Sequence, residues 1–246
     1  MKKRLDLLLL ENGLVSPLDK ARAMIMAGQV LVDDRPQTKP GTLIGVGSLI
    51  RLKNHKKWVS RGSLKLIGAL EKWAIDPTDL ICLDVGASTG GFTDVLLQKG
   101  AKRVYALDVG YGILDWKLVS DPRVVVMDRT NIRHLMPEHI PEPMDFLCSD
   151  VSFISLKKAL PAALATLKTG GQGVALIKPQ FELPKQIIGP GGIVTESAHH
   201  QRAIDSILSQ CETWNIHPID TTPSPITGPK GNQEFLFYFS KLAKVS

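Results

Sequence analysis

The sequence predicts an α/β fold, with a doubly wound parallel sheet that is preceded by a small α+β unit. From residue 62 onward, apolar strand-like runs alternate with helical patterns, as is typical of a parallel sheet covered by helices. Residues 1–53 hold two short amphipathic helices and then short strands, too little chain to bury a large core. A polar, basic connector at 54–60 separates the two patterns. We therefore predict one domain over 1–53, a linker over 54–60 and a second domain over 61–246.

The first unit begins with two helices. Leucines recur at helical spacing over residues 5–14, and apolar residues do so again over 21–25. Ser16 followed by Pro17 predicts the start of the second helix, with Ser16 as its cap. The rest is expected as a strand over 30–32, a turn over 33–36 and two strands within 42–52.

The second unit reads as a Rossmann-like succession of strands and helices. Helices are expected over 62–74, 91–99, 155–167 and 197–214. Strands are expected over 80–85, 103–107, 124–127, 144–149, 173–177, 216–221 and 234–240. Alternation of this kind implies a parallel sheet with helices on both faces.

Charge is distributed unevenly along the chain. Residues 1–61 contain 12 Lys and Arg against 5 Asp and Glu, whereas the remainder contains 18 against 19. A basic segment on a neutral body favours a polyanionic partner, since contacts to phosphates release counterions. A solvated basic surface without a partner would give the same count, and charge alone leaves both open.

The three cysteines, Cys82, Cys148 and Cys211, are too few for a disulfide framework and are expected to be reduced. The apolar run after the basic N-terminus is only four leucines long, which does not fit a signal peptide. No stretch approaches the roughly 20 apolar residues of a membrane span. We therefore expect a cytoplasmic protein.

A glycine-rich loop follows the first strand of the second unit. The run from Asp84 to Phe92 has the spacing Gly-x-x-x-Gly-Gly, not the Gly-x-Gly-x-x-Gly that cradles a dinucleotide pyrophosphate. This spacing disfavours a nicotinamide-dependent oxidoreductase and fits S-adenosylmethionine, which has an amino-acid tail and a ribose but no pyrophosphate. A plain strand-to-helix turn is the alternative. The predicted cofactor-binding residues here are Asp84, Gly86, Ala87, Ser88, Thr89, Gly90, Gly91 and Phe92, with Asp84 suited to the ammonium group of the tail.

Two further acids end the next two strands. Asp108 lies 24 residues after Asp84, where α/β nucleotide folds place the acid that accepts from ribose hydroxyls. Asp128 ends the third strand and is expected at the adenine edge, with a helix cap as its alternative role.

Asp150 and Lys178 end the fourth and fifth strands and should face the same crevice. Asp150 is followed by Val-Ser-Phe and not by the prolines that accompany methylation of a base amino group. Cys148 leaves open carbon methylation through a thiolate, although a thiol inside an apolar strand also fits inert core. A lysine that closes a buried strand, as Lys178 does, can deprotonate a ribose 2′-hydroxyl. Lys65 and Glu234 could complete the group or could be ordinary surface charges.

Eight segments, in order along nearly the whole chain, resemble the TlyA (haemolysin A) family of ribosomal RNA 2′-O-methyltransferases, whose catalytic domain is FtsJ-like. They include Asp-Val-Gly-Ala-Ser-Thr-Gly-Gly-Phe at 84–92, Asp-Val-Ser-Phe at 150–153 and Lys-Pro-Gln-Phe at 178–181; the others lie at 58–62, 108–112, 129–131, 191–194 and 224–234. The resemblance implies a catalytic tetrad of Lys65, Asp150, Lys178 and Glu234. Lys178 would then deprotonate the 2′-hydroxyl of a cytidine, Lys65 would help lower the proton affinity there, and the two carboxylates would hold the lysines. No metal is implied.

The first unit resembles the RNA-binding domain of ribosomal protein S-four, through Arg-Leu-Asp at 4–6, Lys-Ala-Arg at 20–22 and the strand after Gly28. The resemblance implies ribosomal RNA or ribosomal subunits as partner, bound by shape and backbone charge. The expected RNA-binding residues are Lys3, Arg4, Lys20, Arg22 and Arg61.

Two rival functions stay open at this stage. A non-catalytic ribosome-assembly factor would bind RNA without an intact tetrad. A membrane-lytic haemolysin would need a membrane-spanning or strongly amphipathic segment, and the sequence shows neither.

Overall fold

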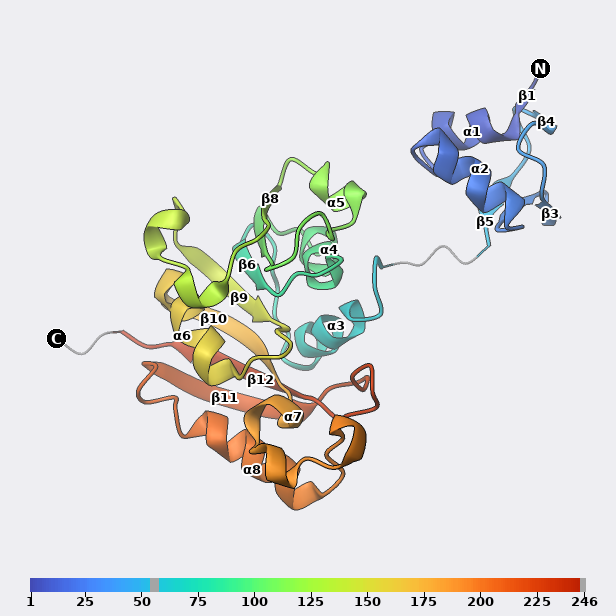
Figure 1. The fold of residues 1–246 in the computed structure, drawn as a ribbon. Helices are drawn as coiled ribbons and strands as arrows, with labels where there is room; N and C mark the ends of the chain where they lie inside the picture. The colour runs from blue at the N-terminus through green and yellow to red at the C-terminus, as the bar shows by residue number, and fades with distance from the viewer. Residues whose placement is uncertain (54–57, 244–246) are drawn as a thin grey trace. The chain divides into compact units, whose positions relative to one another are not determined.

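The computed structural model describes residues 1–53 and 58–243, which form two compact units, Met1–Lys57 and Trp58–Ser246 (Figure 1). Most of the predicted linker, residues 54–57, lies outside the described residues. The other three linker residues belong to the second unit. Trp58 and Val59 pack against its apolar core, and the Val59 backbone N–H donates to Asp94 Oδ2 at 2.8 Å.

The first unit is a small α+β fold. Its elements are β1 (Lys2–Arg4), α1 (Leu5–Glu11), α2 (Leu18–Met26), β2 (Val30–Val32), β3 (Arg35–Gln37), β4 (Leu43–Gly45) and β5 (Ile50–Leu52). Strand β1 pairs with β4, and β2 pairs with both β3 and β5. Both helices bury one face against the strands, where Leu5, Leu9 and Ile25 of the helices share a core with Val30 of β2.

Two local predictions for this unit are wrong. Helix α2 begins at Leu18 with Pro17 at its N-cap position, so Ser16 lies one residue before the cap, and proline has no polar side chain to cap the helix. Residues 35 and 36 are strand and not turn. Asp33 and Asp34 both adopt positive φ, which closes a two-residue hairpin, so pairing resumes at once with Val32 opposite Arg35.

The second unit is a seven-stranded sheet with the strand order β11-β12-β10-β9-β6-β7-β8. Its strands are β6 (Ile81–Val85), β7 (Arg103–Leu107), β8 (Val124–Met127), β9 (Met144–Ser149), β10 (Leu167–Ile177), β11 (Ile216–Pro223) and β12 (Phe235–Lys241). Its helices are α3 (Ser63–Lys72), α4 (Gly91–Gln98), α5 (Trp116–Val119), α6 (Leu156–Thr166), α7 (Pro179–Glu182) and α8 (Ser197–Leu208), with short 3₁₀ turns at Ile132–His134, Pro137–His139, Lys185–Ile187 and Pro190–Gly192.

The sheet is mostly parallel, but one edge departs from the predicted all-parallel arrangement. Strand β12 runs antiparallel to both β10 and β11. Strands β11 and β12 are joined by a loop over 224–234 without a helix, and a connection of this kind favours an antiparallel hairpin over a crossover. The antiparallel direction brings the start of β12 beside the end of β10, where Phe235 pairs with Ile177.

Helices cover both faces of the sheet, as predicted (Figure 1). One core packs side chains of α3, α4 and α5 against the sheet, and the other packs those of α6 and α8 against the opposite face. Successive residues of β9 alternate between the two: Phe146 and Cys148 join the first core and Leu147 joins the second. Among the described residues, no helix is long and apolar enough to cross a membrane.

Candidate active site

Three cavities adjoin one another where the parallel strands end. Their volumes are 850, 320 and 450 Å³, and we call them the first, second and third cavity. Gly86 and Asp150 border the first two, Lys178 borders the second and third, and Ser152 borders all three. Open α/β sheets bind ligands at this edge, and the sequence motifs were expected to meet there.

The glycine-rich loop runs between the first and second cavities. Gly86 borders both, and its φ of +82° is accessible to glycine with little strain. A Cβ at this position would lie 3.0 Å from the Asp150 carbonyl oxygen, so the loop depends on glycine to approach the end of β9. Six other predicted cofactor-binding residues border the second cavity: Asp84, Ala87, Ser88, Thr89, Gly91 and Phe92.

Asp84 stabilises the helix that follows the glycine-rich loop. Its side chain is fully buried, and Oδ2 accepts hydrogen bonds from both the backbone N–H and the hydroxyl of Thr93 at 2.9 and 2.7 Å. Burial raises the pKa of Asp84 to about 7 despite these bonds. The structure therefore gives Asp84 a role in fixing the first turn of α4, and direct contact with a ligand stays a prediction.

Gly90 is not among the residues that border the three cavities, contrary to its predicted place. Its φ is +96°, and a Cβ would lie 2.1 Å from Leu118 Cδ1 and 2.8 Å from Leu114 Cδ1. The glycine is therefore needed for packing of the loop against α5.

We expect Gly90→Ala to destabilise the second unit by about 2 kcal/mol more than Gly170→Ala, since the latter adds backbone strain without a clash. Gly170 also has positive φ, +74°, but a Cβ on it would have no atom of the described residues within 4 Å. Urea unfolding followed by tryptophan fluorescence measures this, because all four tryptophans, at 58, 73, 116 and 214, lie in the second unit. Equal losses in the two variants would contradict the packing role.

Asp108 lies at the first cavity, as expected from its position after β7. Its two carboxylate oxygens accept from the backbone N–H groups of Ser88 at 2.9 Å and Gly110 at 2.8 Å. The carboxylate thus ties the glycine-rich loop to the next loop and still borders the cavity.

Asp128 does not border the first cavity, contrary to expectation. Its carboxylate accepts from the Gly112 N–H at 2.8 Å and so holds the loop after β7. The cavity wall is formed by Asn131, Ile132 and Arg133 a few residues later. The sequence could have pointed to this wall only through the Arg-Thr-Asn segment at 129–131, which is one of the segments that resemble the family but does not itself indicate a role.

Lys65, Asp150, Lys178 and Glu234 meet at the second cavity or its border with the third. Lys65 Nζ lies 2.9 Å from Asp150 Oδ2 and 2.7 Å from Glu234 Oε2, and Lys178 Nζ lies 2.6 Å from Asp150 Oδ1. Only 6% of Lys65, 5% of Lys178 and 1% of Glu234 is exposed. Two amines and two carboxylates thus lie together, three of them buried and Asp150 half-buried, and their formal charges balance.

The cluster assigns different partners to the two lysines. Asp150 pairs with both, whereas Glu234 pairs with Lys65. Burial alone lowers the pKa of Lys65, but the charges of Asp150 and Glu234 outweigh it and the pKa is raised. Burial likewise opposes ionisation of Asp150, but Lys178 and Lys65 outweigh it and the pKa is lowered. Lys65 is therefore held as an ammonium by two carboxylates, whereas Lys178 has Asp150 as its one carboxylate partner among the described residues.

The chain matches known proteins over both units. A family model described as FtsJ-like methyltransferase matches residues 58–241, and one described as S4 domain matches residues 3–50. A relative from Mycobacterium tuberculosis (strain ATCC 25618 / H37Rv), named 16S/23S rRNA (cytidine-2′-O)-methyltransferase TlyA, is 42% identical over 239 residues, covering 96% of this chain and 89% of the relative. The chain belongs to the TlyA (haemolysin A) family of FtsJ-like methyltransferases.

A second relative and a solved structure also match this TlyA-family protein. Hemolysin A of Brachyspira hyodysenteriae is 38% identical over 237 residues, covering 96% of this chain and 99% of the relative. A solved structure from Mesorhizobium loti, an S-adenosylmethionine-dependent methyltransferase, matches with a TM-score of 0.55 at 14% identity, covering 71% of this chain and 96% of that one. The last match shows the shared fold, and the resemblance drawn from the motifs is confirmed.

Cys148 of the TlyA-family protein does not serve the carbon-methylation alternative. The thiol is fully buried in the core between the sheet and helices α3, α4 and α5, and burial raises its pKa well above the ordinary thiol value. A thiol in this state supplies no thiolate for covalent catalysis.

The third cavity lies beyond Lys178 and was not predicted. Phe153 and Phe181, whose ring centroids are 5.5 Å apart, border it together with Pro229, and Phe153 is 92% exposed. The amide oxygen of Gln180, on the same wall, is buried and accepts no hydrogen bond from the residues that the structure describes. Phe153 and Gln180 belong to two of the family motifs, which could have marked them as candidate site residues. A motif does not indicate which cavity its side chains border.

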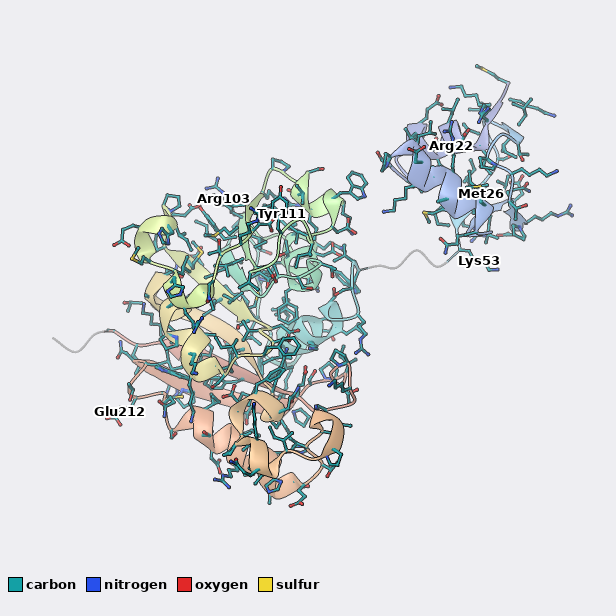
Figure 2. The ribbon with its side chains drawn as sticks, in the orientation of Figure 1. Arg22, Met26, Lys53, Arg103, Tyr111 and Glu212 are labelled. Carbon is teal, nitrogen blue, oxygen red and sulfur yellow. The ribbon has the colours of Figure 1, made fainter. Side chains whose placement is uncertain are left out.

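The predicted RNA-binding residues of the first unit are exposed or half-buried, and Lys3, Arg4 and Arg22 have acidic partners. Lys3 pairs with Glu11 at 2.7 Å, while Arg4 and Arg22 both pair with Asp6, at 2.7 and 3.2 Å (Figure 2 labels Arg22). Lys20 is exposed on α2, and Arg61 is exposed beside the second cavity of the other unit. Sequence reasoning missed Asp6, which is fully buried and orients two arginines whose side chains are 47% and 43% exposed.

We expect Asp6→Asn to destabilise the first unit by about 1–3 kcal/mol, because it removes a buried acceptor of charged hydrogen bonds. Hydrogen exchange of the α1 and α2 amides measures this, since the unit contains no tryptophan. Asp19→Asn is the control, because Asp19 is 93% exposed and lies 3.6 Å from Arg22, so its loss should cost little.

The same residue makes the first unit sensitive to acid. The hydrogen bond from Arg4 is the main cause that lowers the pKa of Asp6 from 3.8 to about 2. A depressed pKa stabilises the folded unit above the unfolded value, so this contribution is complete above about pH 4 and is lost as the pH falls toward 2. Protection factors of the α1 and α2 amides, which correct for the intrinsic pH dependence of exchange, should fall over that range in wild type, and those of Asp6→Asn should show no such component.

Proposed function

We propose that this protein transfers a methyl group from S-adenosylmethionine to the 2′-hydroxyl of a cytidine in ribosomal RNA. The observation that carries the proposal is the buried cluster of Lys65, Asp150, Lys178 and Glu234 between a glycine-loop cavity and a cavity with an aromatic wall. The substrate follows the name of the mycobacterial relative, which is 42% identical over 96% of this chain.

The residues around the first and second cavities fit the methyl donor. The first cavity has the size of known small-molecule sites, roughly 300–1,000 Å³. Asp108 presents a carboxylate there for ribose hydroxyls, and Gly86, which borders both cavities, has no side chain to obstruct a ligand that extends from one to the other. When bound, S-adenosylmethionine supplies an electrophilic methyl group on a positively charged sulfur. The pKa of Asp84 is about 7 without a ligand, and a positively charged ligand nearby would lower that pKa and keep the carboxylate ionised.

The cluster activates the acceptor hydroxyl in this proposal. Lys178 Nζ, in its neutral form, takes the hydroxyl proton while the ribose oxygen gains the methyl group and the sulfur–methyl bond breaks. The Lys65 ammonium stabilises negative charge that develops on that oxygen, and Asp150 and Glu234 hold Lys65 in place. Burial of Lys65, Lys178 and Glu234 limits their contact with water and strengthens these interactions.

RNA recognition is divided between the two units in the proposal. Arg4 and Arg22, held by Asp6, and Lys3 and Lys20 would contact phosphates from the first unit. Arg61, at the rim of the second cavity, would contact the backbone near the reacting nucleotide. The two domains in this proposal are residues 1–53 and 61–246, and Trp58 and Val59 before the second domain pack against its apolar core.

The test is methyl transfer from radiolabelled S-adenosylmethionine by the full chain to purified ribosomal subunits and to protein-free ribosomal RNA. We expect one labelled product, 2′-O-methylcytidine, identified by mass spectrometry of the digested RNA. Label on a base, or binding of RNA without any transfer, would overturn the proposal, and the second result would support an assembly factor.

A further inference from the structure

A serine outside the predicted tetrad contacts the proposed base. Ser152 Oγ accepts a hydrogen bond from Lys178 Nζ at 2.9 Å, and the same nitrogen lies 2.6 Å from Asp150 Oδ1. Ser152 is exposed and borders all three cavities. Its hydroxyl therefore lies where the donor, the acceptor and the base would meet.

The number of acceptors around Lys178 matters for the direction of its lone pair. A neutral amine has two N–H bonds and one lone pair in a tetrahedral arrangement. Asp150 fixes one N–H, and the second N–H and the lone pair could then still exchange the two remaining positions. A second acceptor, Ser152, fixes the other N–H, so only one direction is left for the lone pair.

We propose that Ser152 is a positioning residue that aims the lone pair of Lys178 at the acceptor hydroxyl. This inference rests on the proposed function, because it needs Lys178 to act as the base. The contact joins residues 26 positions apart, from the loop after β9 to the end of β10. Strands β9 and β10 pair with each other up to Ser149 and Ala175, so the loop that carries Ser152 starts from a fixed position beside the end of β10.

Two other roles for Ser152 make different predictions. A purely structural role would appear as a loss of stability, but the side chain is exposed and fills no part of the core. A role in binding RNA would raise KM for RNA and leave kcat unchanged. A positioning role lowers kcat and leaves both binding constants unchanged.

The test compares Ser152→Thr with Ser152→Val, which differ by one hydroxyl in place of a methyl group. We expect Ser152→Thr to keep kcat within about threefold of wild type and Ser152→Val to lower it by about 10- to 100-fold, the cost of a misaligned reacting group. The donor Kd and the RNA KM should change by less than about twofold in both variants, and unfolding followed by tryptophan fluorescence should be the same.

The outcomes separate this inference from the proposed function. If wild type transfers no methyl group to a ribose, the proposed function fails. If wild type is active and the Thr and Val variants are equally active, the proposed function stands and the role of Ser152 is wrong. A raised RNA KM with unchanged kcat in Ser152→Val also overturns the positioning role.

Discussion

Lys178→Ala should lower single-turnover methyl transfer by about 10³-fold and leave binding of S-adenosylmethionine almost unchanged. Removal of a general base typically costs 10²–10⁴-fold. The nitrogen is held by Asp150 and Ser152 at the border of the second and third cavities, away from the Asp108 side of the first. The measurement is rapid-quench transfer of labelled methyl to RNA, with donor affinity from calorimetry.

Lys168→Ala is the matched control for that variant. Lys168 lies on the same strand, β10, but its side chain is 50% exposed and pairs with Asp145 away from the site. Its removal should change neither transfer nor donor binding, because exposed ion pairs contribute little. Activity in Lys178→Ala within tenfold of wild type would rule out Lys178 as the base.

Lys65→Met should destabilise the second unit by about 3–5 kcal/mol, the usual cost of leaving a buried charge without its partner. Glu234 is 1% exposed and pairs with Lys65, so the single substitution strands its carboxylate. The double variant with Lys65→Met and Glu234→Gln removes both charges and should recover most of the lost stability. It should nevertheless stay inactive, because the positive charge beside the acceptor oxygen is gone.

Urea unfolding followed by tryptophan fluorescence measures both variants and their coupling. Lys72→Met is the control on the same helix, α3. Lys72 is 44% exposed and lies 3.4 Å from Asp220, so its loss should cost less than about 1 kcal/mol. If the double variant is as unstable as Lys65→Met alone, the unpaired Glu234 carboxylate is not the cause of the lost stability.

Local patterns in the sequence were sufficient for most of the fold and part of the site. Strand and helix periodicity predicted the main strands and helices of the second unit, although β10 begins at Leu167 and α8 ends at Leu208, each several residues from its predicted boundary. Asp108 lies at its expected cavity, because the end of a parallel strand is itself a position in space. The four tetrad residues were named through the family resemblance, since Lys65 and Glu234 look like surface charges on their own.

Other site features depend on distances that no local pattern encodes. Asp128 ends its strand as predicted, yet its carboxylate faces Gly112, and Gly90 makes room for Leu118 and not for a ligand. Asp6 is an acid in a basic segment that becomes the anchor of two arginines only when α1 and α2 pack together.

The order of residues was enough to establish the two-unit α/β fold, the glycine-rich loop and the family, because periodicity and motif spacing are properties of neighbouring residues. The folded chain was needed to show that Asp150 serves both lysines, that Glu234 serves Lys65 and that Ser152 contacts Lys178. Lys65 and Asp150 are 85 positions apart in the chain, and they meet because α3 packs on the same face of the sheet as Phe146 and Cys148 of β9. The chemistry of a charged group depends on which opposite charges lie within a few ångströms, and that neighbourhood is created by strand order and helix packing.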